Sequence, residues 1–291
     1  MDLVAGATGH LGTRICELLR QRQRRVRALI RPSSNPERTA ALTALGATLV
    51  QGDLRDHVSL AVACEGAEVV YSTATAIMSR AGDDALTTVD REGQLALVRA
   101  ARAAGARHFV FISFPPAPDD FPIQAGKRAV EAALRNSEMA HTVLQASLFM
   151  EVWLSPALGF DYPNAKATVY GTGEPKISWI SFKDVAEFAV RAPVTAAARN
   201  AVIPIGGPEA LSPHEVITMF ERASGKRFAV QHVPDQTLLA QFQAAEEPVQ
   251  KSLAGLARFY AAGNSIGMEQ TARAFGVTLT PLAEYVARVT G

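Results

Sequence analysis

The chain has 291 residues, of which 48% are hydrophobic and 20% are charged, and its 29 basic and 28 acidic side chains leave a formal net charge of +1. This composition is ordinary for a globular protein with a buried core. The balanced charge gives no strong field that would attract a nucleic acid or a membrane surface, and the sequence contains no nucleic-acid-binding motif. We therefore expect neither as a partner.

We expect no signal peptide, because the first strand starts almost at Met1, and no apolar run approaches the length of a membrane span. The two cysteines, Cys16 and Cys64, fall in helix-like segments and have no His or Cys at metal-ligand spacing. We expect both to be buried and reduced, and the six histidines to bind no metal. Reduced cysteines make the cytoplasm the expected compartment.

Short apolar runs alternate with helical patterns along the first half of the chain. The predicted strands are 3–6, 26–30, 47–52, 67–72, 108–113 and 141–146. The predicted helices between them are 11–23, 36–45, 57–63, 88–104 and 123–136. This alternation, with strands that are apolar throughout, predicts a parallel sheet that carries helices on both faces.

The pattern changes after residue 148, where 150–176 is rich in aromatic residues, Gly and Pro and indicates loops with short elements. A short strand and a helix that starts at Asp184 or its neighbours return to the core, as does a strand at 202–207. The later patterns are helical: a start at 212–215, where Ser212 and Glu215 form a capping box, then 235–262, 268–275 and a last helix from Thr280 and Pro281.

These elements predict an α/β fold, a Rossmann-type doubly wound parallel sheet with a smaller, mostly helical C-terminal substrate lobe. The first domain is expected at 1–149, with returns to its core near 176–206. The substrate lobe is expected at 150–175 and 207–291.

The segment LVAGATGHLGTRI joins the first strand to the first helix. Its glycines have the spacing G-x-x-G-x-x-G and are Gly6, Gly9 and Gly12. Glycines permit a tight turn and a close backbone approach to a pyrophosphate, and the helix offers amide groups and the positive end of its dipole. We therefore predict a dinucleotide site. The remaining residues expected at the phosphates are Thr8, His10 and Leu11.

The second strand ends in Arg31, where NAD-binding sheets usually carry an acidic residue for the ribose 2′-hydroxyl. Ser33 and Ser34 follow. An arginine fork and hydroxyl groups suit a phosphate, so the sequence predicts a 2′-phosphate and hence NADP(H). The alternative is an exposed arginine on an NAD-binding protein.

Two further strand ends are expected to contact the cofactor. After the third strand, Asp53 can meet the adenine ring and Leu54 can pack on its face; alternatively or additionally, Asp53 caps the short helix that begins there. After the fourth strand, the small residues Thr73 and Ala74 would let the cofactor lie across the strand ends.

Several motifs together resemble those of a known family. They are GATGHLG, IRPSS, GDLRD, FVFIS, KRAVE with TVLQASLFME downstream, and SWISFKDVA. The set resembles the NmrA-like, atypical short-chain dehydrogenases, which include isoflavone and phenylcoumaran benzylic ether reductases, bacterial NADPH quinone reductases and redox-sensing regulators. The resemblance covers most of residues 1–207. It implies a Rossmann domain with a variable substrate lobe and the use of NADP(H).

Dehydrogenases with the Tyr-x-x-x-Lys motif place a tyrosine four residues before the lysine, but here Ile123 precedes Lys127 and cannot donate a proton. The resemblance implies that Lys127 is the lysine that the ether reductases keep without this tyrosine. Lys127 is therefore our candidate catalytic residue. Its ammonium could bind the nicotinamide ribose, or polarise or protonate a substrate oxygen if burial or neighbours place its pKa suitably. The alternative is a surface lysine.

Ser113 ends the fifth strand, where the resemblance implies the serine of the related dehydrogenases. We expect it to contact the cofactor; otherwise its hydroxyl satisfies the backbone at the strand end. Phe114 and the Pro-Pro pair after it are expected to form a rigid floor near the nicotinamide. Phe149 and Met150 are expected over the edge of the cofactor, with plain packing as the alternative.

An uncharged aromatic region is expected to cover the nicotinamide, although core packing would also explain its rings. Its residues are Phe160 and Phe182 together with the substrate candidates Phe114, Trp153, Tyr162 and Trp179. Such a lid suits a planar hydrophobic substrate.

A quinone accepts hydride readily and needs little acid help, which fits a site without the tyrosine. We therefore predict an NADPH-dependent reductase of quinones or other conjugated or aromatic compounds, acting as a monomer or homodimer. The alternative is an NADP(H)-binding redox sensor without turnover. An epimerase or dehydratase is disfavoured because it usually needs the Tyr-Lys pair.

Overall fold

The computed structural model describes residues 1–79 and 85–291, and the chain divides into two compact units. Unit 1 comprises Met1–Ser113, Pro122–Gln145 and Val185–Ile203. Unit 2 comprises Phe114–Phe121, Ala146–Asp184 and Pro204–Gly291. Each unit is described by itself.

Unit 1 is built on a seven-stranded sheet with the order β3-β2-β1-β4-β5-β6-β9. Its strands are β1 (Asp2–Ala5), β2 (Val26–Ile30), β3 (Thr48–Gln51), β4 (Val69–Ser72), β5 (His108–Ser113), β6 (Ala140–Ala146) and β9 (Ala201–Ile205). Strands β1 to β6 pair in parallel, and every residue of β1, β4, β5 and β6 is buried. The predicted doubly wound α/β fold is confirmed.

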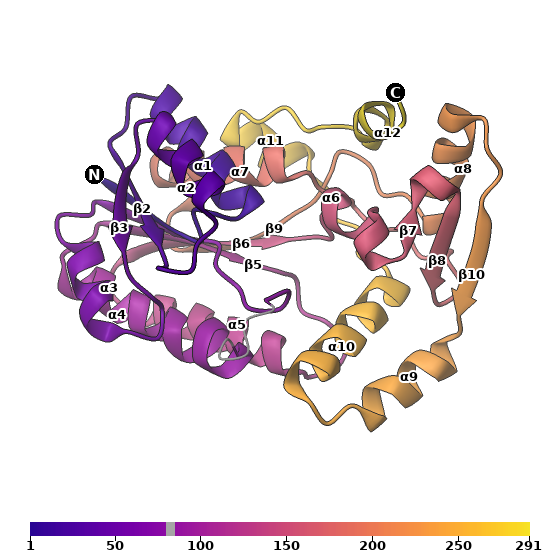
Figure 1. Ribbon diagram of the computed structural model, residues 1–291, viewed down its shortest axis with the longest axis horizontal. Helices are drawn as coiled ribbons and strands as arrows, with labels where there is room; N and C mark the ends of the chain where they lie inside the picture. Colours follow the sequence, from indigo (N-terminus) through magenta and orange to yellow (C-terminus); the bar gives the residue numbers. More distant parts are fainter. Residues whose placement is uncertain (80–84) are drawn as a thin grey trace. The chain divides into compact units, whose positions relative to one another are not determined.

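Helices cover both faces of this sheet, as continuous apolar strands require. They are α1 (His10–Gln21), α2 (Pro36–Ala44), α3 (His57–Cys64), α4 (Gln94–Ala103), α5 (Pro122–Arg135) and α7 (Phe182–Arg191). Figure 1 shows α1, α2 and α7 on one face and α3, α4 and α5 on the other. Cys16 on α1 and Cys64 on α3 are buried free thiols, as expected, and burial raises the pKa of the Cys64 thiol to about 11.

The helix predicted at 88–104 has two parts. A π-helix, η1 (Leu86–Gly93), leads directly into α4. A Cβ atom on Gly93 would lie 2.7 Å from Leu54 Cβ and 2.9 Å from the Thr88 carbonyl oxygen, so the backbone packs there without room for a side chain. A π-helical turn changes the direction of side chains on one stretch of helix and is frequent at functional sites.

Unit 2 contains a three-stranded sheet, with the order β10-β8-β7, that the sequence did not predict. Its strands are β7 (Phe160–Asp161), β8 (Lys166–Tyr170) and β10 (Ala229–Val233). The expectation of a mostly helical lobe is therefore incomplete. Four of the five residues of β10 are exposed, so this strand lacks the buried apolar face by which a sequence pattern reveals a strand.

The helices of unit 2 are α6 (Met150–Trp153), α8 (Pro213–Ser224), α9 (Asp235–Ala244), α10 (Pro248–Ala262), α11 (Glu269–Phe275) and α12 (Leu282–Thr290). Side chains of α6, α8, α10 and α12 contribute to a hydrophobic core that includes Phe220, Phe259 and Tyr285. The predicted capping box is confirmed at the start of α8, where Ser212 and Glu215 accept each other's backbone N–H.

Helix α7, which the sequence placed at Asp184 or its neighbours, begins at Phe182. The Ser181 hydroxyl accepts the Asp184 N–H there. The buried Asp184 carboxylate instead accepts the N–H and the hydroxyl of Thr280, within unit 2.

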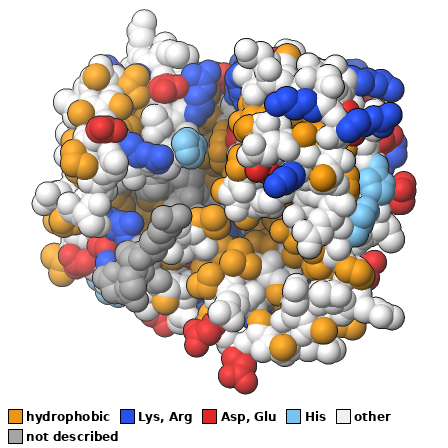
Figure 2. Space-filling view, turned by 45° about the vertical axis from the view of Figure 1, so that its right-hand side comes forward, with side chains coloured by type: hydrophobic (Ala, Val, Ile, Leu, Met, Phe, Trp, Pro, Cys, Tyr) orange, Lys and Arg blue, Asp and Glu red, His pale blue; other side chains and the backbone are white. Residues whose placement is uncertain are grey.

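None of the described helices is long and apolar enough to cross a membrane. On the face drawn in Figure 2, basic and acidic side chains are interspersed, with hydrophobic groups scattered among them. This distribution agrees with the near-zero net charge.

A buried histidine links strands β5 and β6 in unit 1. The Thr142 hydroxyl donates to the Ala198 carbonyl at 2.7 Å, so its oxygen accepts from His108 Nε2 at 2.8 Å. This arrangement places a proton on Nε2 of His108. Burial, aided by Arg199 and His141, lowers the pKa of His108 from 6.5 to about 4.

We predict that this histidine makes the fold sensitive to acid. Because its folded-state pKa lies below the unfolded value, its contribution is present above pH 6.5 and is lost as the pH falls toward 4. Urea unfolding at about pH 7.5 and about pH 5 should show a loss of roughly 2 kcal/mol from this group. The loss should shrink in His108→Asn but remain in His57→Asn, which changes an exposed histidine. An equal acid sensitivity in all three proteins would contradict the assignment.

Candidate functional site

The glycine loop after β1 adopts a backbone that other residues could not take. Gly6 has φ +81°, and a Cβ atom there would lie 2.6 Å from Thr73 Oγ1 and 2.7 Å from the Ala74 backbone nitrogen. A Cβ atom on Gly12 would lie 2.1 Å from the Gly6 carbonyl oxygen. The loop is therefore folded tightly on itself and against the end of β4, and Thr73 and Ala74 lie beside it.

Helix α1 starts at this loop, with Gly9 as its N-cap. Among the described residues, no side chain caps this helix, and its first turn contains no acidic residue. Leu11 is buried, whereas His10 is exposed. The helix end thus presents amide groups and the positive end of the dipole at the point between β1 and β4 where the strand order reverses, which fits a pyrophosphate.

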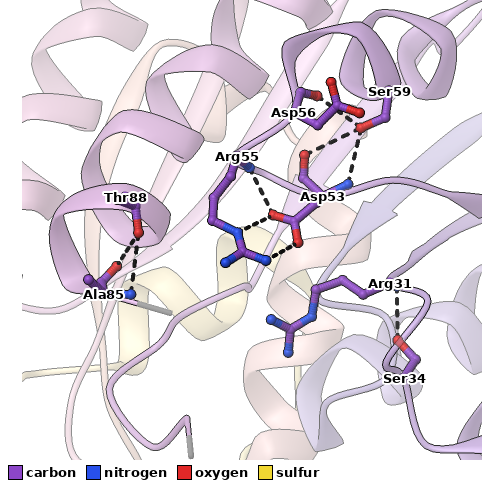
Figure 3. A network of polar contacts seen from close by, with 8 residues as sticks. All are labelled: Arg31, Ser34, Asp53, Arg55, Asp56, Ser59, Ala85 and Thr88. Carbon is purple, nitrogen blue, oxygen red and sulfur yellow. Dashed lines mark hydrogen bonds and ion pairs between the residues drawn. The ribbon is translucent and has the colours of Figure 1, made fainter. Parts of the chain in front are cut away.

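Arg31 begins a tight turn at the end of β2. The Arg31 N–H donates to Ser34 Oγ at 2.9 Å, and the Ser34 N–H donates to the Arg31 carbonyl at 3.0 Å. Ser33 is exposed, and Arg31 and Ser34 are half-buried. In Figure 3 the Arg31 guanidinium extends away from the turn, toward the region of Asp53.

Asp53, after β3, is bound by an arginine that the sequence reasoning overlooked. Arg55 donates to both carboxylate oxygens of Asp53, at 2.9 and 2.7 Å, and its N–H adds a third bond (Figure 3). Arg55 and, more weakly, Arg31 lower the pKa of Asp53, against the effect of its burial. The proposed cap is corrected: the Asp56 side chain, not Asp53, accepts the Val58 N–H at the start of α3.

A third arginine contacts the glycine loop directly. Arg38 on α2 donates from Nη1 to the Thr8 carbonyl at 2.7 Å. Leu54, after β3, packs against the backbone of Gly93. The GDLRD motif was the signal for Arg55, whereas Arg38 could be located only once α2 was placed beside the glycine loop.

Lys127, on α5, is buried, with 7% of its surface exposed, so the surface-lysine alternative is excluded. Its Nζ donates to the Ile112 carbonyl at 2.9 Å and lies 4.7 Å from the centre of the Phe111 ring. Burial lowers the pKa of Lys127, while the charges of Asp90 and Glu131 act in the opposite direction. The amine is thus fixed at the end of β5.

Glu131 collects three donors although it is only 3% exposed. The Ser113 hydroxyl and Arg128 Nη1 each donate to it at 2.6 Å, and Gln145 Nε2 donates at 3.2 Å. The Ser113 hydroxyl is therefore held by a carboxylate on α5, and not by the backbone. Whether Ser113 also contacts the cofactor stays a prediction.

Asp90, on the π-helix η1, is 1% exposed. Its Oδ2 accepts the Ala76 N–H at 2.8 Å. Gln94, at the start of α4, accepts from Ser72 and donates to the Ala74 carbonyl at 2.8 Å. These bonds fix the segment after β4, where Thr73 and Ala74 lie against the glycine loop.

The residues of unit 2 that the sequence predicted near the nicotinamide pack in separate aromatic pairs. Phe114 stacks on Phe121, and Phe149 packs on Phe182 at 4.6 Å between ring centres. Met150 has no exposed surface and belongs to the hydrophobic core, as the packing alternative expects.

Trp153 and Trp179 share one neighbour, Tyr260 on α10, at 5.4 and 5.7 Å between ring centres. Tyr162 packs elsewhere, against Phe220. The structure thus brings together two of the expected substrate residues around a tyrosine that the sequence reasoning missed.

Residues 3–286 of the chain match the model of the NmrA-like family. The chain belongs to this family. Its membership confirms the resemblance drawn from the motifs.

Curated relatives of this NmrA-like protein include an enzyme and an assembly factor. An NAD(P)H azoreductase of Xenophilus azovorans is 31% identical over 229 residues, which are 78% of this chain and 74% of the relative. The photosystem II assembly factor Ycf39 of Synechocystis sp. is 32% identical over 240 residues, which are 80% of this chain and 70% of the relative.

A crystal structure of an NADPH-dependent quinone oxidoreductase from Escherichia coli, complexed with NADPH, has a TM-score of 0.80 to this NmrA-like protein. The two chains cover each other completely and are 23% identical. At this identity the likeness shows the fold.

We predict that Arg31 discriminates between the two nicotinamide cofactors. In Arg31→Ala, affinity for NADPH should fall about 10- to 100-fold, the usual loss for hydrogen bonds to a charged group, while affinity for NADH should hardly change. Fluorescence titration with both cofactors measures the difference. Arg25→Ala removes an exposed arginine just before β2 and is the matched control. Equal losses for NADPH and NADH in Arg31→Ala would refute the assignment.

A second prediction concerns the charge on Lys127. Because burial lowers its pKa, NADPH affinity should decline with rising pH before the ordinary value of 10.5 is reached, as the ammonium loses its proton. Asp90 raises this pKa, so Asp90→Asn should move the decline to lower pH. The amide oxygen can still accept the Ala76 N–H. Glu138→Gln, an exposed change in the same unit, should leave the profile in place. Coincident profiles for Asp90→Asn and wild type would contradict the coupling.

Proposed function

We propose that this protein is an NADPH-dependent reductase that transfers a hydride to a quinone or another hydrophobic, conjugated or aromatic small molecule. The observation that carries the proposal is the buried Lys127, with its Nζ on the Ile112 carbonyl, and Ile123 in place of the tyrosine one turn earlier. Ile123 is only 4% exposed and offers no proton. A site with a buried lysine and no tyrosine at this position suits a hydride acceptor that needs little acid catalysis.

The cofactor assignment rests on unit 1. The glycine loop and the start of α1 would hold the pyrophosphate, and Arg31 with Ser33 and Ser34 would hold the 2′-phosphate. Arg38 adds positive charge beside the glycine loop, whereas the charge of Arg55 is paired with Asp53. The names of the azoreductase relative and of the quinone oxidoreductase with the same fold support NADPH-dependent reduction.

Bound NADPH supplies a hydride, becoming NADP⁺, and a quinone that takes this hydride and one proton becomes a hydroquinone. The protein's task is then to orient and to stabilise charge. We assign Lys127 to the nicotinamide ribose, with Ser113 and Glu131 as the groups that fix the end of β5 next to it. Its ammonium also places a positive charge where a substrate oxygen gains negative charge.

The second candidate is an NADP(H)-binding protein that acts through a partner without turnover. One relative supports it, because the assembly factor of Synechocystis sp. is as similar to this chain as the azoreductase is. The two candidates share the cofactor site and differ in acceptor-dependent oxidation of NADPH.

We predict that purified protein oxidises NADPH only when an acceptor is present. NADPH absorbance should be followed with menadione, a benzoquinone and an azo dye. Lys127→Met keeps much of the side-chain volume but removes the charge, and should lower kcat/KM at least ~10-fold. Lys166→Met, at an exposed lysine on β8, should retain wild-type activity. If NADPH binds tightly but none of these acceptors causes its oxidation, the second candidate replaces the reductase assignment.

A further inference from the structure

Three aromatic side chains of unit 2, here called the aromatic site, carry polar hydrogens. They are Trp153 on α6, Tyr170 at the end of β8 and Tyr260 on α10. Tyr260 lies 5.4 Å from Trp153 and 5.2 Å from Tyr170 between ring centres, and Trp153 lies edge-on to Tyr170 at 6.3 Å. The three rings therefore form one contiguous aromatic surface.

The polar hydrogens of this site have no protein acceptor within residues 1–79 and 85–291. Elsewhere in the same unit such groups are satisfied. Trp179 Nε1 donates to the Leu211 carbonyl at 3.0 Å, and Tyr285 Oη donates to the Leu154 carbonyl at 2.9 Å. Buried tyrosine and tryptophan usually find a partner. None of these three donor atoms is among the fully buried, unpartnered polar atoms of residues 1–79 and 85–291, so each keeps accessible surface at which a ligand can bind.

Tyr260 is the most enclosed member, with 4% of its surface exposed, whereas Trp153 and Tyr170 are half-buried and leave an open edge. Burial raises the pKa of Tyr260, and Tyr170 raises it further. Both phenols therefore keep their protons near neutral pH and act as donors. In the described chain no lysine or arginine stacks on these three rings, so the site favours a neutral ligand over an anionic one.

We propose that Tyr260 donates a hydrogen bond from its hydroxyl to a carbonyl oxygen of a neutral quinone that packs against Trp153 and Tyr170. This inference rests on the proposed function and names its substrate class. It also supplies a phenol, from α10, to a protein that lacks the tyrosine of the Tyr-x-x-x-Lys motif. The phenol keeps its proton and donates it in the hydrogen bond that holds the carbonyl oxygen of the quinone. Tyr260 thus determines specificity for substrates with an acceptor oxygen.

The test uses the tryptophans as reporters, because the chain has two, Trp153 and Trp179, and both contact the Tyr260 ring. Quenching of their fluorescence is titrated with menadione and with 2-methylnaphthalene, which has the same ring system and methyl group but no oxygens. Wild-type protein should bind menadione more tightly. Tyr260→Phe should weaken menadione about 5-fold, the usual net worth of one hydrogen bond, and leave 2-methylnaphthalene unchanged.

Tyr285→Phe is the matched control, because it removes a phenol oxygen from the same core that already has a protein acceptor. It should lower stability without changing the preference between the two ligands. A Tyr260→Phe protein that keeps the wild-type preference overturns the inference. So does a wild-type protein whose fluorescence menadione leaves unchanged.

Turnover separates this inference from the function on which it rests. Menadione binding that depends on Tyr260, without oxidation of NADPH, would reject the reductase and retain the quinone site. Oxidation of NADPH by menadione at equal kcat/KM in wild type and Tyr260→Phe would retain the reductase and reject the role of Tyr260.

Discussion

The burial of one ammonium group governs the organisation of unit 1. A lysine removed from water needs compensating charge and hydrogen bonds, or it loses its proton. Here Lys127 has a backbone carbonyl, the face of an aromatic ring and two buried carboxylates that come from different helices. The charge of Asp90 acts on Lys127 from the π-helix, and the charge of Glu131 acts on it from α5 itself. Asp90 Oδ2 accepts the Ala76 N–H in the segment after β4, and Glu131 accepts the Ser113 hydroxyl at the end of β5. The lysine's two carboxylates therefore link its charge to both of these segments.

This coupling explains why an irregular helix stands at this position. A π-helical turn is rare and poorly packed by itself, and it persists where its side chains have a particular task. Residues Leu86–Gly93 place Asp90 so that it binds the Ala76 N–H and acts on Lys127. Gly126 on α5 faces the π-helix, because a Cβ atom there would be in ordinary contact, at 3.4 Å, with the Asp90 carbonyl oxygen.

The sequence predicted two kinds of feature. One kind depends on local backbone chemistry, and the other is the sheet of unit 1, whose central strands are buried on both faces. Strands β1, β4, β5 and β6 are buried along their whole length, the glycine loop needs Gly6 and Gly12, and Ser212 caps by a local rule. Strand β10 was not predicted because its side chains are exposed. The junction between the π-helix and α4 lies at Gly93, whose contact with Leu54 only the fold reveals. Asp56, and not Asp53, is the cap because α3 begins at His57, which puts Asp56 at the N-cap position. Glu131 is identified by the three donors that the fold brings to it. Tyr260 is identified by its ring neighbours and by a hydroxyl that has no protein acceptor among the described residues. No spacing rule could reveal them.

The position of Ile123 limits how this site can evolve. An isoleucine there could be exchanged for a tyrosine by mutation, which would complete the Tyr-x-x-x-Lys pattern in the sequence. The side chain is nearly enclosed, however, and a phenol would need space that the packed surroundings do not offer without rearrangement, at a typical cost of about 1–3 kcal/mol. Reversion to the tyrosine-dependent chemistry of its distant relatives would thus require several coordinated changes, and selection for a stronger acid would act more readily on residues outside α5.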